Sequence, residues 1–171
     1  MDWWLLILRV VHVGSAMVWF GGAIIGGFFL APTAAALGDS AGPFMDHLMR
    51  RRRMGIMFPI VAALTVLAGA ALYWRDSGGL QSAWIMSASG LAFTVGGIAA
   101  IASFALGFVL VAPSVGEQTA VRNELAASGG APSADQLARL EHADGRMRLA
   151  TRVDLPLILV AGLLMATARY L

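Results

Sequence analysis

The sequence predicts an all-α integral membrane protein built from four membrane-spanning helices. Hydrophobic residues make up 58% of its 171 residues and charged residues only 13%, whereas soluble domains carry about 25% charged residues. Four apolar segments each approach the roughly 20 residues that a helix needs to cross a bilayer. Because these segments use most of the chain, residues 1–171 are expected to form a single membrane domain.

Each span has recognisable boundaries. The expected spans are residues 10–31, 54–74, 83–112 and 155–170. Trp3 and Trp4 come before the first span and are typical of residues at the membrane interface. Asp154 is expected to cap the start of the fourth span, with Pro156 tolerated in its first turn.

The arginines predict the orientation of the four spans. Nine arginines lie in the two long loops: Arg50, Arg51, Arg52, Arg53, Arg122, Arg139, Arg146, Arg148 and Arg152. Only Arg9, Arg75 and Arg169 lie at the opposite ends of the spans. The positive-inside rule therefore predicts cytoplasmic loops and both termini outside. The expected location is the inner (plasma) membrane. The net charge is only +2, so the expected partner is the lipid bilayer and not nucleic acid.

The long loop at 113–152 has helical signals of its own. Residues 117–127 have a helical composition, and Ser128-Gly-Gly-Ala-Pro132 is a break. Ser133 followed by Gln136 is a capping-box pattern that starts a second helix. The loop is therefore expected to form a cytoplasmic helical hairpin between spans 3 and 4.

A weak internal repeat relates the two halves of the chain. Gly27-Phe-Phe-Leu-Ala-Pro32-Thr ends the first span, and Gly107-Phe-Val-Leu-Val-Ala-Pro113-Ser ends the third. This pattern favours a four-helix bundle of two parallel helical hairpins related by a pseudo-two-fold axis along the membrane normal. The alternative is chance similarity between apolar sequences. In the repeat, the position that matches His12 falls near Ala92 or Phe93.

Small residues at every fourth position predict close contact between helices. Ala92, Gly96 and Ala100 follow this spacing, as do Gly22 and Gly26. Such faces allow helices to touch within lipid. They fit packing within one chain, a homodimer, or contact with other membrane subunits.

His12 is the candidate centre, because it is the only histidine within an expected span and ionisable residues in spans are usually functional. The residues expected at a similar depth or at the same end are Met86, Met165, Arg9, Arg75 and Arg169. An imidazole with a thioether suits haem iron or Cu(I), with either Met86 or Met165 as the second ligand, and the arginines would balance haem propionates. The alternative is a histidine that hydrogen-bonds to a neighbouring carbonyl or serine, with arginines that only reach the interface.

Other chemistry is restricted by composition. Cysteine and lysine are both absent, which excludes disulfides, thiolate metal sites and Schiff bases. Met45, His47 and Met49 form a second cluster that would suit copper, although methionines near a membrane surface more often serve packing. The spans contain no serine, histidine and aspartate set of the kind that soluble hydrolases use.

The stretches His12-Val-x-x-x-x-x-Trp19-Phe-Gly21-Gly22 and Phe44-to-Pro59, with its basic run before Met-x-Pro, carry a resemblance. They resemble the first and second helices of the copper-resistance D (CopD) and HemJ-type group of four-helix membrane proteins. The resemblance implies a haem-b-associated bundle with His12 as axial ligand and a redox or tetrapyrrole role. A copper permease is the alternative within the group. A third alternative is a non-catalytic subunit that docks onto a larger membrane complex.

Overall fold

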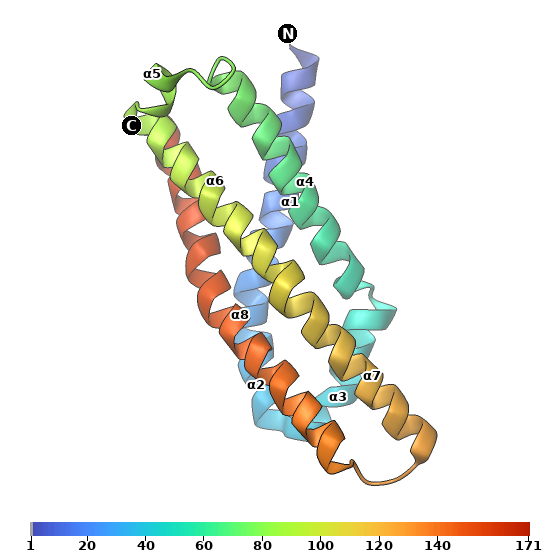
Figure 1. Cartoon of the computed structure of the whole chain (residues 1–171). Helices are drawn as coiled ribbons and strands as arrows, with labels where there is room; N and C mark the ends of the chain where they lie inside the picture. Colours follow the sequence, from blue (N-terminus) through green and yellow to red (C-terminus); the bar gives the residue numbers. More distant parts are fainter. Residues whose placement is uncertain (1) are drawn as a thin grey trace.

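The computed structural model describes residues 2–171, and this part of the chain is helical with no strand. Four helical runs are long and apolar enough to cross a membrane: Trp3–Leu37, Met54–Asp76, Ala88–Ser128 and Ala134–Tyr170. The predicted helical class and the four apolar segments are therefore confirmed. Figure 1 shows both termini at one end of the molecule and both long connections at the other.

The first half of the chain contains two long helices. The Asp2 side chain caps α1 by accepting a hydrogen bond from the Leu5 N–H. Arg53, with a φ of 56°, ends the connection between the two helices. The elements in order are α1 (Trp3–Ile25), the π turn η1 (Gly26–Leu30), α2 (Ala31–Leu37), η2 (Gly38–Ala41), α3 (Gly42–Asp46), η3 (His47–Arg51) and α4 (Met54–Asp76).

The second half also contains two long helices, and the short helix α5 precedes the first of them. Ser87 caps the third long helix by accepting from the Gly90 N–H, so this helix starts five residues later than the expected residue 83. The elements in order are α5 (Ser82–Ile85), α6 (Ala88–Leu106), the π turn η4 (Gly107–Val111), α7 (Ala112–Ser128), α8 (Ala134–Thr167) and η5 (Ala168–Tyr170).

The last long helix corrects one expectation. The predicted capping box is confirmed, because the Ser133 and Gln136 side chains each bond to the other residue's backbone N–H. The helix then continues for 34 residues with Pro156 in its interior. Asp154 is therefore not a helix cap. The proline does not start a new helix here because the preceding residues already form regular helical turns.

Three π turns occur among the described residues, and two of them, η1 and η4, lie at matching places in the two halves. The third is η3 in the first connection. The two matching turns begin at Gly26 and Gly107, a separation of 81 residues, and a proline occupies the first turn of the helix that follows each. A proline inside a helical run lacks an N–H, and its ring displaces the carbonyl four residues earlier. For Pro32 and Pro113 these carbonyls belong to Phe28 and Val109, which lie within the π turns. The wider turn therefore accommodates the proline without ending the helix.

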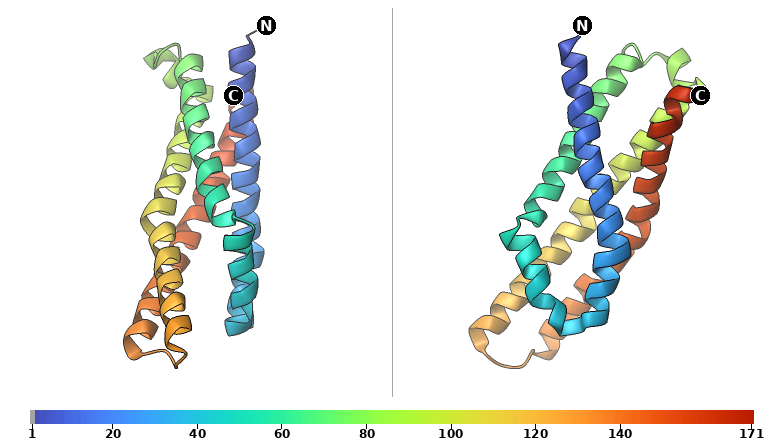
Figure 2. Two further views of the ribbon diagram at one scale, coloured as in Figure 1. Left: turned by 90° about the vertical axis from the view of Figure 1, so that its right-hand side faces the viewer. Right: turned by 180° about the vertical axis from the view of Figure 1, so that it is seen from behind.

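Helix packing occurs mainly within each half. Helix α1 packs along α4, and α6 packs along α8 (Figure 2). The buried residues between long helices are mostly small; they include Ala62, Ala68, Ala92, Ala99 and Ala161. Larger side chains join the two halves, since Trp19 of α1 packs in one core with Ala62 of α4 and Ile158 of α8. The Tyr73 hydroxyl also lies 2.6 Å from the Thr94 hydroxyl, which links α4 to α6.

An ionic network holds α7 against the first half of α8. Arg139 lies 2.5 Å from Glu117 and 3.0 Å from Glu124, measured between guanidinium nitrogens and carboxylate oxygens. The hydrogen bonds from Arg139 lower the pKa of the Glu124 carboxyl, and those from Glu124 and Glu117 raise the pKa of Arg139. Val121 of α7 and Ala143 of α8 are completely buried.

Candidate functional site

His12 lies between α1 and α4. Its Nδ1 atom is 2.8 Å from the Thr65 carbonyl oxygen of α4. A carbonyl can only accept a hydrogen bond, so Nδ1 carries the proton in this contact and the lone pair of the neutral ring lies on Nε2. This is the tautomer that a histidine needs in order to bind a metal through Nε2, with its other nitrogen held by a backbone carbonyl.

Neighbouring residues hold the imidazole in place. A Cβ atom at Gly69 would lie 2.7 Å from His12 Cε1 and 3.0 Å from its Nδ1, so the ring occupies space that only a glycine leaves open. One turn further along α1, the Ser15 and Thr65 hydroxyl oxygens are 2.8 Å apart, and both side chains are buried. Ser15 also donates to the Val11 carbonyl at 2.6 Å. We call His12, Ser15 and Thr65 the α1–α4 polar contact.

The two methionines that were expected near His12 belong to the other half of the molecule. Met86 ends α5 and is 70% exposed. Met165 of α8 packs against α6, because a Cβ at Gly96 would lie 3.2 Å from its Cγ. Neither methionine therefore belongs to the α1–α4 polar contact.

The three outer arginines also have separate environments. Arg75 forms an ion pair with Asp2, at 2.5 Å between Nη1 and Oδ2. Hydrogen bonds from the Leu5 N–H and from Arg75 lower the pKa of the Asp2 carboxyl. The Arg169 guanidinium carbon lies 5.1 Å from the centre of the Tyr170 ring, and Arg9 is exposed. Among the residues that the structure describes, no group of three or more histidine, aspartate or glutamate side chains is arranged to hold a metal ion.

Sequence analysis missed a second polar contact. The Ser103 hydroxyl of α6 donates to the Asp154 carboxylate of α8, and Ser103 is buried. This carboxyl lies at the start of the apolar part of α8, where a charged group is costly unless it has a partner. A usable signal was present, since a buried serine at the small-residue spacing of α6 favours a hydrogen bond to a polar group on the neighbouring helix.

The two contacts differ in chemistry. The α1–α4 polar contact offers one nitrogen lone pair on a fixed ring and no carboxylate. The Ser103–Asp154 contact offers carboxylate oxygens and no nitrogen. No family model, curated protein or solved structure matches this chain.

Proposed function

We propose that the chain is a multi-pass inner-membrane protein in which His12 binds haem b as an axial ligand. The observation that carries this proposal is the Nδ1 hydrogen bond to the Thr65 carbonyl, because it directs the lone pair of His12 to Nε2. Haem, when bound, supplies a one-electron redox centre. The chain's own residues fix the ring orientation through Thr65 and Gly69.

The proposed site is incomplete within one chain. Arg75 and Arg169 have partners in Asp2 and Tyr170, and Met86 and Met165 lie in the other half of the molecule. The fit therefore covers one axial ligand only. We infer that a second copy of the chain, or another membrane subunit, supplies the remaining contacts.

The proposed topology follows the arginine distribution. Nine of twelve arginines lie in the two long connections, which occupy one end of the molecule (Figure 1). The positive-inside rule assigns this end to the cytoplasm. Both termini and His12 then belong to the outer half of the membrane, and the α7–α8 hairpin extends into the cytoplasm. The matching π turns support two parallel helix pairs derived from one repeated unit.

A second candidate is a non-catalytic membrane subunit, in which His12 only fastens α1 to α4. The hydrogen bond to Thr65 fits this role as well. His12→Asn separates the two, because an asparagine amide can still donate from nearly the position of Nδ1 but offers no nitrogen at Nε2. His47→Asn is the matched control, since His47 lies in η3 outside the four long helices.

The test is the visible spectrum of the purified full-length protein together with its thermal unfolding. If haem is bound, the wild type and His47→Asn show a Soret band, and His12→Asn loses it while its Tm without haem stays near that of the wild type. A colourless wild type that loses stability in His12→Ala but keeps it in His12→Asn supports the fastening role instead. Stoichiometric copper by elemental analysis, lost in His12→Asn, would support the copper alternative.

A further inference from the structure

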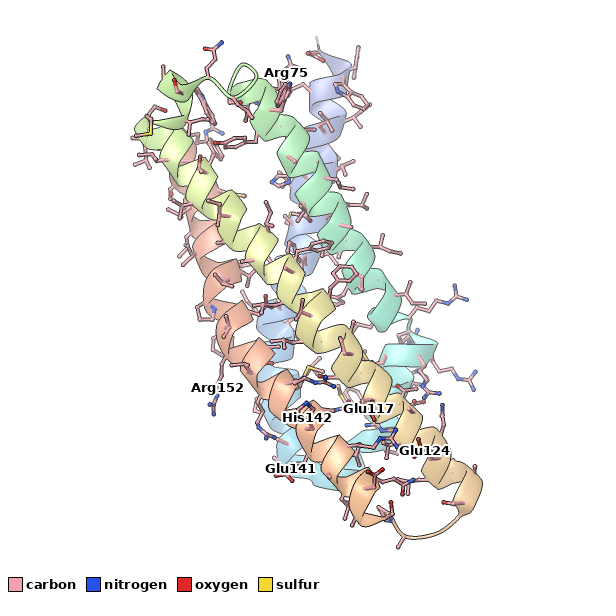
Figure 3. All side chains as sticks on the ribbon, viewed as in Figure 1. Arg75, Glu117, Glu124, Glu141, His142 and Arg152 are labelled. Atoms are coloured by element: carbon pink, nitrogen blue, oxygen red, sulfur yellow. The ribbon has the colours of Figure 1, made fainter. Side chains whose placement is uncertain are left out.

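The far end of α8 from His12 contains an unexplained pair of hollows. Their volumes are about 510 and 380 Å³, and both are lined by Ala138, His142 and Arg146. Glu141, Gly145, Arg148 and Leu149 also line one hollow, and Glu117 and Arg139 also line the other. Figure 3 labels His142 and Arg152 on α8 and Glu117 on α7, and His142 and Glu117 line the same hollow.

Arg146 is the residue in these hollows that has a buried polar atom without a partner. Its Nε atom is buried and has no hydrogen-bond partner. Among the side chains that the structure describes, no carboxylate forms an ion pair with it. Arg139 on the same face differs, because Glu117 and Glu124 already neutralise it.

An anion in these hollows would balance the unpaired guanidinium charge of Arg146. A guanidinium stays charged in proteins, and its planar N–H groups match the oxygens of phosphate or carboxylate. A buried N–H group without a partner is unfavourable. His142 and Arg148 line the same hollow as Arg146 and add two further donors, which together suit an anion with three or more oxygens better than a single carboxylate. Glu141 at this hollow would repel an anion that extends toward it.

We propose that Arg146, His142 and Arg148 bind a phosphate group. The site lies on α8 before its apolar part, at the end of the molecule where the long connections and their arginines lie (Figure 1). This location is accessible both to a free phosphate and to the phosphate of an anionic lipid headgroup. The proposal does not depend on haem binding by His12.

The first experiment uses inorganic phosphate with the full-length protein in a non-ionic detergent, and measures Tm at constant ionic strength set with sodium chloride. The wild type is expected to gain about 5 °C at saturating phosphate, as ligand binding to the folded state alone predicts. Arg146→Gln should lose this gain, and His142→Gln should reduce it. Arg152→Gln is the matched control and should respond like the wild type, because Arg152 lines neither hollow.

The second experiment distinguishes the source of the phosphate. The same four proteins are placed in nanodiscs of phosphatidylcholine alone or with phosphatidylglycerol added. A gain in Tm with phosphatidylglycerol that Arg146→Gln loses and Arg152→Gln keeps identifies a lipid headgroup. A gain only with inorganic phosphate identifies a soluble phosphate.

The proposal is overturned if neither probe raises the Tm of the wild type. It is also overturned if Arg146→Gln gains as much as the wild type, since phosphate also stabilises folded proteins non-specifically. If Arg146→Gln does not fold, Arg146→Lys and His142→Gln replace it. A full gain in both of these variants would equally contradict the proposal.

Discussion

In the α1–α4 pair, hydrogen bonds join His12 and Ser15 to Thr65, whereas in the α6–α8 pair one joins Ser103 to Asp154. Measured along the helix from each π turn, His12 precedes Gly26 by fourteen residues and Ser103 precedes Gly107 by four. At 1.5 Å per residue these separations are about 21 and 6 Å. The two pairs therefore share a backbone plan but place their polar contacts near opposite ends.

The matching positions explain this difference. The residue 81 positions after His12 is Phe93, which stacks on Trp84 with an interplanar angle of 8°. The residue 81 positions before Ser103 is Gly22, whose Cα faces the Phe58 ring. Each matching position therefore lies beside an aromatic ring, Trp84 of α5 for Phe93 and Phe58 of α4 for Gly22. The backbone determines where helices touch, and the residues at that level determine which chemistry the contact has.

The largest expected loss of stability is in the α6–α8 pair. Ser103→Ala leaves the Asp154 carboxyl without its donor and should lower the free energy of unfolding by about 2–3 kcal/mol. Adding Asp154→Leu should restore most of this loss, since both polar partners are then removed. Chemical unfolding followed by circular dichroism measures both. Equal losses in the single and double variants would show that the contact is not responsible.

The α1–α4 pair should respond less, because its polar contact includes several bonds. Gly69→Ala places a Cβ 2.7 Å from His12 Cε1 and should cost about 1–2 kcal/mol by displacing the ring. Gly97→Ala on α6 is the control, because nothing lies within 4 Å of its Cβ position, and it should stabilise the helix by up to about 1 kcal/mol. The same unfolding assay applies, and equal effects at both glycines would contradict the close approach of His12.

The two prolines that follow η1 and η4 test whether these π turns have the same cause in both halves. Pro32→Ala and Pro113→Ala each restore a backbone N–H and remove the ring from the carbonyl within the π turn. Each should stabilise the protein by about 1 kcal/mol, and amide hydrogen exchange should slow at 26–30 or 107–111. A response in only one half would show that the two π turns have different causes.

The smallest effect concerns pH and the α7–α8 hairpin, which has no counterpart in the first half. The pKa of Glu124 is lowered from its ordinary value of 4.5 by Arg139. Its contribution to stability is therefore complete above about pH 4.5 and is lost as the pH falls through the lowered pKa. Limited proteolysis at the 129–133 break should accelerate at acid pH in the wild type. Glu124→Gln should show faster cleavage already at pH 7 and a weaker pH dependence.

Local sequence signals predicted the helices well. Hydropathy located the four apolar segments, and Ser133 with Gln136 marked the true start of α8. The two similar stretches that end in Pro32 and Pro113 also correspond to two π turns. These features depend on residues close together in the chain, so the sequence carries them directly.

Contacts between helices were less predictable. Hydropathy does not specify how far one helix is shifted along another, so the spacing of Ser103 indicated a polar partner on a neighbouring helix but did not identify Asp154. The partner of His12 is a backbone carbonyl, and every residue has one, so residue type could not identify Thr65. Met86 and Met165 were grouped with His12 by depth alone, and depth does not say which way a side chain points.

The length of α8 has a mechanical consequence. Its 34 residues extend for about 50 Å, which exceeds the roughly 30 Å hydrocarbon core of a bilayer. Arg146 lies on one arm of this rod, and Met165 on the other. Pro156 removes a hydrogen bond between them, two residues after Asp154, and prolines are where helices bend. The Ser103–Asp154 hydrogen bond therefore fastens α8 to α6 within two residues of the position where α8 lacks a backbone hydrogen bond.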